Sequence, residues 1–173
     1  MIELPDWFME AAKPDPGDLA LEIGCGFGEW MLPLARHVAF VCGFGIHPQT
    51  IENGLRLAFR NSVGNVAFAV GDGHKIPSSF SCAQDVDGEP MYVPAIEDGI
   101  VTLVYSISAF QHLSRSIVIE YLTETVRVLA SGGRCLHQFS GWTIEEVRDA
   151  GVTAGLKHVN VIDGPVLLLY GEK

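Results

Sequence analysis

Three glycines at alternating positions form the pattern in this chain that points most directly to chemistry. The stretch 19–28 runs from an apolar segment through Glu22 into Gly24, Gly26 and Gly28. A short apolar run that ends in a turn predicts a strand buried on both faces. Because glycine has no Cβ, the turn can be tight and a ligand can approach the backbone closely. Apolar residues then recur with helical spacing, so the pattern predicts a strand, turn and helix that bind a nucleotide-like ligand.

The spacing of these glycines separates the turn from two better-known phosphate-binding motifs. A dinucleotide fingerprint requires its third glycine at position 29, where this chain has Glu29. A P-loop requires Lys followed by Ser or Thr, which is absent after the glycines. The segment Glu22-Ile-Gly-Cys-Gly-Phe-Gly28 instead resembles the first motif of class I S-adenosylmethionine-dependent methyltransferases. A glycine-rich turn that binds nothing is the alternative.

Three further segments carry the same resemblance, which is to the small-molecule, type 11-like branch of the family. Residues 70–73, Val-Gly-Asp-Gly, resemble the family's third motif. Residues 103–113 resemble the fourth motif and the segment after it. Residues 127–134, Arg-Val-Leu-Ala-Ser-Gly-Gly-Arg, match an Arg-x-Leu-x-Pro-Gly-Gly stretch, with Ser131 in place of proline. The resemblance runs from about Leu19 to the end of the chain.

The resemblance implies that S-adenosylmethionine is the cofactor and S-adenosylhomocysteine the product. It places Glu22 near the amino group of the methionine, although Glu22 could instead cap the turn. It places Asp72 against the adenine amino group, although Asp72 could be a turn former. The cofactor-binding residues that the resemblance implies are Glu22, Gly24, Cys25, Gly26, Gly28, Gly45, Ile46, His47, Asp72, Gly73 and Ser106.

Two positions depart from the family pattern. Gly45 stands where the family usually carries an acid that binds both ribose hydroxyls, and Thr102 stands where an acid is usual in the fourth motif. His47 could contact the ribose instead, or simply be solvated. These departures support an alternative in which the chain is a catalytically inactive, methyltransferase-like binding or regulatory module. A nicotinamide-dependent oxidoreductase is disfavoured by Glu29 and by Gly45.

One histidine is the candidate catalytic group for methyl transfer by in-line displacement. His112 follows the fourth expected strand at the edge where ligands bind, and histidine titrates near neutrality, so it could act as a base. It could equally pack beside the following helix. The remaining histidines show no spacing typical of metal ligands, so no metal is expected.

The elements that must position these residues alternate between strand and helix. Such alternation predicts an α/β fold whose parallel strands are joined by right-handed crossovers. The last two strands have no helix between them, so one must run antiparallel. The methyltransferase resemblance implies the same fold, a Rossmann-like seven-stranded mixed sheet with helices on both faces and a terminal antiparallel hairpin. The expected strands are 19–23, 38–46, 65–70, 100–105, 134–139, 157–162 and 166–170, with helices at 48–59 and 116–129 and after the capping box of Thr143 and Glu146.

Length and composition limit the number of domains, the class of partner and the cellular compartment. The 173 residues correspond to one domain, 1–173. Residues 78–97 are an insertion that is expected to cover the substrate, with a flexible surface loop or an oligomer contact as the alternatives. A formal net charge of −10 argues against nucleic acid as a partner. The resemblance implies a small-molecule substrate. No apolar stretch is long enough for a membrane span, and the four cysteines lack a C-x-x-C pairing. We therefore expect a cytoplasmic protein without a membrane partner; the acceptor and the oligomeric state stay open.

Overall fold

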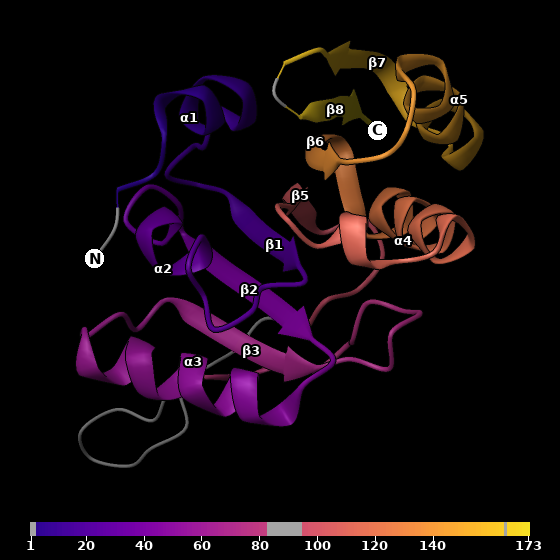
Figure 1. The fold of residues 1–173 in the computed structure, drawn as a ribbon. Coiled ribbons are helices and arrows are strands. Elements are labelled where there is room, and N and C mark those ends of the chain that lie inside the picture. The colour runs from indigo at the N-terminus through magenta and orange to yellow at the C-terminus, as the bar shows by residue number, and fades with distance from the viewer. Residues whose placement is uncertain (1–2, 83–94, 165) are drawn as a thin grey trace.

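A computed structural model describes residues 3–82, 95–164 and 166–173 (Figure 1). Within these residues the strands form one eight-stranded sheet in the order β4-β3-β2-β1-β5-β6-β8-β7. Strand β1 lies between β2 and β5, so the chain reverses its direction of winding there, where α/β sheets bind ligands. The strands are β1 (Leu19–Ile23), β2 (Phe40–Gly45), β3 (Val66–Val70), β4 (Ser81–Cys82), β5 (Val101–Ser106), β6 (Leu129–Phe139), β7 (Lys157–Ile162) and β8 (Leu167–Glu172).

The expected mixed sheet is confirmed, with one strand more than the seven predicted. Strands β1, β2, β3, β5 and β6 pair in parallel, and β8 runs antiparallel to both β6 and β7. The additional strand is β4, which pairs antiparallel with β3 through two residues only. So short a strand leaves no alternating pattern in the sequence. It belongs to the expected insertion 78–97, most of which, including a hairpin expected around Asp87, lies outside the described residues.

Helices cover both faces of the sheet. The first three helices pack on one face, around a core that contains Phe8, Met31 and Tyr105, and α4 and α5 pack on the other (Figure 1). The helices are α1 (Asp6–Ala12), α2 (Met31–Leu34), α3 (Pro48–Arg60), α4 (Arg115–Val128) and α5 (Ile144–Ala154), with a 3-10 turn η1 (Phe110–His112) between β5 and α4.

Local sequence explains where these helices begin. Ser114 caps α4 through the backbone N–H of Ile117, and Thr143 and Glu146 form the predicted capping box of α5. Helix α2 is only four residues long and contains Pro33, which has no N–H to donate to a preceding turn. The strand-turn-helix predicted at the glycines is therefore present, with a short helix.

A buried ion pair fastens the N-terminal segment to the edge of the sheet opposite the strand carboxyl ends. Arg134 Nη2 lies 2.6 Å from Asp18 Oδ2, and Arg134 also donates to the carbonyl oxygens of Ala12 and Lys13. Thr102 donates to Asp18 and accepts from the backbone N–H of Leu19. Thr102 thus holds the start of β1, far from the strand ends that carry the glycine turn.

The described residues contain no helix that combines the length and the apolar character needed to cross a bilayer. Cytoplasmic localisation stays a prediction.

The Arg134 network predicts a pH-dependent loss of stability in Arg134→Met. Burial raises the pKa of Asp18, but hydrogen bonds from Arg134, the Asp15 backbone and Thr102 outweigh it and hold the pKa below 3.8. The variant leaves the buried carboxylate of Asp18 without its cationic partner, although Asp15 and Thr102 still donate to it, so the free energy of unfolding should fall by about 3 kcal/mol at neutral pH.

Because a lowered folded-state pKa stabilises the native state only while the carboxyl is ionised, the difference should shrink as the pH falls below about 3.8. Urea unfolding across pH measures this, with the exposed Arg56→Met as the control. Equal losses in the two variants would contradict the role given to the network.

Candidate functional site

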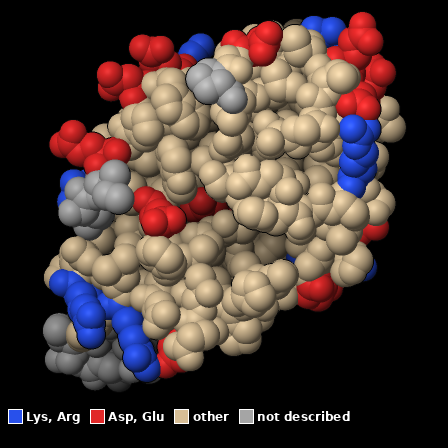
Figure 2. Space-filling model, in the orientation of Figure 1, with Lys and Arg blue, Asp and Glu red and all other residues tan. Residues whose placement is uncertain are grey.

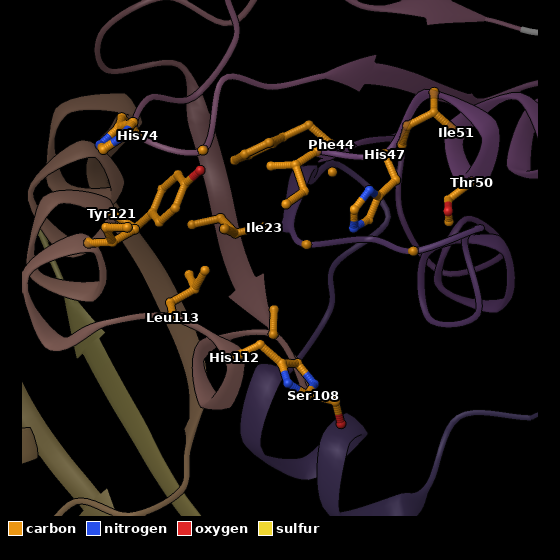
Figure 3. Close-up of a pocket in the computed structure, with 17 residues that line it drawn as sticks. Ile23, Phe44, His47, Thr50, Ile51, His74, Ser108, His112, Leu113 and Tyr121 are labelled. Atoms are coloured by element: carbon orange, nitrogen blue, oxygen red, sulfur yellow. The ribbon is translucent and has the colours of Figure 1, made fainter.

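A pocket of about 430 Å³ lies at the carboxyl ends of the parallel strands (Figure 3). Its walls come from the glycine turn after β1, the end of β2 with the start of α3, the turn after β3, and the segment from the end of β5 into α4. The residues that line it are Ile23, Gly24, Gly26, Phe44, Gly45, Ile46, His47, Thr50, Ile51, Gly73, His74, Ser108, Ala109, His112, Leu113, Ile117 and Tyr121.

The glycine turn forms one wall because a side chain there has no room. Gly24 has a φ of +79°, and a Cβ on it would collide with the side chain of Ala109. Gly26 also has a positive φ, +54°, but no atom lies within 4 Å of the position a Cβ would take. The first glycine therefore permits close packing against the segment after β5, and the second leaves open space beside the pocket.

The end of β2 forms the opposite wall. The pocket is lined here by Gly45, Ile46 and His47. Ile46 is 53% exposed, so its side chain is accessible to a ligand in the pocket. Gly45 has an ordinary φ, and a Cβ on it would meet only Ile51 Cδ1, at 3.7 Å. No close approach requires this glycine, so its effect is to leave room in the pocket.

The turn after β3 contributes Gly73 to the pocket but not the carboxylate of Asp72. Asp72 Oδ1 accepts from the backbone N–H groups of His74 and Lys75, at 2.8 and 2.9 Å. These two bonds lower the pKa of Asp72, and the bond from the backbone of His74 has the larger effect. Asp72 therefore closes its own turn through Oδ1 and is not among the pocket-lining residues, and its contact with adenine stays a prediction.

Glu22 also lies away from the pocket. Its side chain is 1% exposed, and its Oε2 accepts a hydrogen bond from the hydroxyl of Tyr105 at 3.1 Å. Burial raises the pKa of Glu22 to about 8, assisted by the charge of Glu29, although bonds from Tyr105 and the Met31 backbone lower it. Glu22 is thus a largely protonated carboxyl at neutral pH, on the sheet face that packs against the first helices.

Three other residues that the resemblance implied lie behind the pocket. A Cβ on Gly28 would crowd Phe68, Leu32 and Met31, so this glycine serves helix packing. Cys25 is 3% exposed, and burial raises the pKa of its thiol. Ser106 is fully buried at the end of β5, and its Oγ has no hydrogen-bond partner among the described residues.

His112 lies in the pocket wall, in the turn η1 after β5. Its Nε2 is 3.2 Å from Nε2 of Gln111, and Ser108, which has a φ of +57°, lies beside it in the view of Figure 3. Both residues lie on the side of the pocket opposite His74, and the hydroxyl of Ser108 is directed away from the other lining side chains. His112 is therefore placed to reach a ligand, and its function as a base stays a prediction.

Several lining residues were not expected from the sequence. Phe44 belongs to β2, Tyr121 and Ile117 belong to α4, and the apolar character of all three predicts core positions. Thr50, in the first turn of α3, and His74 carry polar groups at opposite ends of the pocket (Figure 3). The alternation of side chains along each strand could have indicated these positions. It places Ile23 and Phe44 on the sheet face that packs against α4.

Charge is unevenly distributed over the face of the molecule that Figure 2 shows. Figure 2 shows uncharged surface around a central hollow in which acidic side chains appear, whereas Lys and Arg lie toward the edges of the view. The described residues contain no group of three or more His, Cys, Asp or Glu side chains arranged to hold a metal ion. Among the described residues, no Asp, Glu, Lys or Arg lines the pocket of Figure 3, so its polar side chains are those of His, Ser, Thr and Tyr residues.

A family model and several solved structures are similar to this chain. A model of the methyltransferase domain matches residues 20–133, about two thirds of the chain. The structure of a TehB-like methyltransferase from Corynebacterium glutamicum is similar, with a TM-score of 0.70 and 18% identity, over 95% of this chain and 85% of that one. A methyltransferase from Aquifex aeolicus has a TM-score of 0.68 and 17% identity, over 96% and 93%. The expected domain limits of 1–173 stay a prediction.

Curated relatives correct the expectation that nucleic acid is no partner. A 23S rRNA (uracil-C5)-methyltransferase from Methylococcus capsulatus is 36% identical over 81 residues, 47% of this chain and 18% of that protein. An uncharacterized RNA methyltransferase from Oceanobacillus iheyensis is 34% identical over 73 residues, 42% of this chain and 16% of that protein. The chain thus spans less than a fifth of these relatives. The earlier exclusion rested on net charge, which describes the whole chain and does not say what one pocket accepts.

The burial of Glu22 predicts that Glu22→Gln stabilises the protein at alkaline pH. The unfolded chain releases this proton near pH 4.5, whereas the native state holds it to about pH 8. Wild-type stability should therefore fall as the pH rises from about 4.5 to 8. The variant lacks this penalty and keeps an oxygen to accept from Tyr105.

At pH 9 the variant should exceed the wild type by on the order of 5 kcal/mol in free energy of unfolding, and at pH 4.5 the two should nearly agree. Denaturant unfolding at both pH values measures the difference, with the exposed Glu10→Gln as control. Parallel pH profiles for wild type and Glu22→Gln would show that Glu22 is ionised in the native state.

Proposed function

This chain belongs to the methyltransferase-domain family, and we propose that it transfers a methyl group from S-adenosylmethionine to an acceptor, releasing S-adenosylhomocysteine. The observation that carries the proposal is the pocket itself. The positive-φ glycine turn after β1 and the open end of β2 face each other across it, within the segment 20–133 that matches the family. A volume of about 430 Å³ is in the range of small-ligand sites.

The residues present fit an adenosyl ligand at three places. The open space at Gly26 lets a ligand approach the backbone. The room beside Gly45 lies next to His47 and Thr50, two side chains that can hydrogen bond to hydroxyl groups. Ile46, Phe44 and Ile23 supply apolar surface for a flat ring. Gly24, Gly73 and the segment 45–47 complete the proposed cofactor site.

The bound cofactor would supply an already activated methyl group on its sulfonium. The chain's own contribution is then to align the acceptor in line with that methyl and to exclude water. An acceptor that carries a proton also needs a base, and we assign this function to His112, which lines the pocket. Nothing else in the proposed reaction requires a charged side chain.

Two acceptor classes are supported by different observations. A small molecule is favoured by the modest, largely apolar pocket. A nucleobase in RNA is favoured by the curated relatives, which are RNA methyltransferases matched over part of their length. RNA would have to be held without a basic patch on the face shown in Figure 2, so contacts to the base would carry more of the binding.

Calorimetric titration of the chain with S-adenosylhomocysteine tests the cofactor, with NAD as the control ligand. We expect saturable binding of the first and none of the second. A native-state ligand at a hundredfold excess over its Kd should also raise stability by about 2.7 kcal/mol. If S-adenosylhomocysteine does not bind, the proposal is contradicted and the inactive, methyltransferase-like module is supported.

The variant Gly45→Asp locates the ribose in the same titration. Because Gly45 has an ordinary φ and free space, aspartate should fit without strain and offer a carboxylate to both hydroxyls. Hydrogen bonds to a charged group predict about tenfold tighter binding. Gly45→Ala adds the Cβ alone and is the control; equal affinity of the two variants would place the ribose elsewhere.

A methyl-labelled cofactor separates the acceptor classes. The chain is incubated with labelled S-adenosylmethionine in two separate reactions. One reaction contains the small-molecule fraction of a cell extract, and the other contains its RNA fraction. Label should enter one fraction and fall at least a hundredfold with His112→Ala, whereas the affinity for S-adenosylhomocysteine should stay within twofold. Unchanged turnover in the variant would contradict the assignment of His112 as a base and leave it with a structural function only.

A further inference from the structure

Tyr121 is the residue of α4 whose side chain reaches the pocket with a polar group at its tip. Its ring packs against Phe44, at 5.8 Å between centroids, and stacks on Phe110 at 6.4 Å. The residue is only 3% exposed, yet it is part of the pocket lining. The ring is therefore fixed by packing, and the hydroxyl is the part that a ligand can meet.

The hydroxyl of Tyr121 forms no hydrogen bond with any described residue. Figure 3 shows it at the tip of the ring, directed toward the turn that follows β3, with Ile23 and Leu113 on the pocket side. Among the described residues the fully buried polar atoms without a partner do not include this oxygen, so the hydroxyl is open to the pocket, where a ligand that supplies an acceptor can take the place of water. Burial, with the nearby carboxylates of Asp72, Glu120 and Glu124, raises the pKa of Tyr121 to about 12, so the hydroxyl stays a donor at neutral pH.

Two contacts on either side of Tyr121 hold α4 against this turn. Glu120 Oε2 lies 2.9 Å from His74 Nδ1, and Glu124 Oε2 accepts from the backbone N–H of Ile76 at 3.2 Å. Glu120 precedes Tyr121, and Glu124 follows it by nearly one helical turn. The distance between the hydroxyl and the turn that carries Gly73 is therefore set before a ligand binds.

Asp72, the polar residue that the sequence assigned to this end of the pocket, accepts from the N–H groups of its own turn through Oδ1 and is not among the pocket-lining residues. Its charge nevertheless acts on Tyr121. A flat heteroaromatic ring that enters between Phe44, Ile23 and Leu113 would meet the hydroxyl of Tyr121 at its edge. Adenine has unprotonated ring nitrogens that accept a hydrogen bond from such a donor.

We propose that Tyr121 is a specificity-determining residue for the adenine of the adenosyl ligand, to which its hydroxyl donates a hydrogen bond at a ring nitrogen. This inference rests on the proposed function, because it needs an adenosyl ligand in the pocket. It adds a hydrogen-bond donor on α4 to the contacts that the turn after β3 can make with the base.

Titration of Tyr121→Phe with S-adenosylhomocysteine tests the inference. The variant removes one oxygen and keeps the ring, so thermal unfolding should stay close to the wild type. Loss of a single neutral hydrogen bond predicts about fivefold to tenfold weaker binding. Tyr170→Phe is the matched control, because the hydroxyl of Tyr170 bonds to Glu172 on β8 and lies outside the pocket lining; its affinity should equal that of the wild type.

Analogues of S-adenosylhomocysteine that lack one ring nitrogen of the adenine identify the acceptor. One analogue should bind the wild type about fivefold to tenfold more weakly than the parent compound and lose nothing further in Tyr121→Phe. Wild-type binding with unchanged affinity in Tyr121→Phe would overturn this inference alone. Failure of the wild type to bind S-adenosylhomocysteine would overturn the proposed function and the inference with it.

Discussion

The close approach of Gly24 to Ala109 is the constraint on which the site depends. It brings the turn after β1 directly against the segment after β5, at the point where the sheet reverses its winding. Only a residue without Cβ, in a left-handed conformation, permits this contact. Because the two segments touch, the space on the other side of the turn, toward the ends of β2 and β3, stays open as the pocket. The rest of the sheet serves to hold these four strand ends in register.

The fold could be predicted because its signals are local and repeated. Apolar runs bounded by turns marked β1, β2, β3 and β5, and the capping box of Thr143 and Glu146 marked α5. The missing helix before the last strand correctly implied an antiparallel hairpin. Strand β4 could not be predicted, since two residues carry no period. The short α2 shows how one proline limits a helix that apolar spacing alone would extend.

The site was harder to predict, because position along the chain does not say where a side chain points. Glu22 and Asp72 follow the family pattern, yet one is buried against Tyr105 and the other closes its own turn. Thr102 was interpreted as a departure from the family pattern. In the structure its hydroxyl donates to Asp18, at the edge of the sheet opposite the pocket. Tyr121 was expected only in the core, and it becomes a pocket residue because α4 packs across the strand ends. Such assignments depend on contacts between segments far apart in sequence.

The central claim is that the pocket between the glycine turn and the end of β2 holds the adenosyl ligand. A crystal structure of the chain with S-adenosylhomocysteine tests this most directly, since it locates the ligand without assuming an acceptor. We expect the ligand to contact Gly24 and Gly26 on one side and the segment 45–47 on the other, with its adenine toward Tyr121. A ligand bound at any other place, with this pocket empty, would contradict the claim and leave the family fold without the site proposed for it.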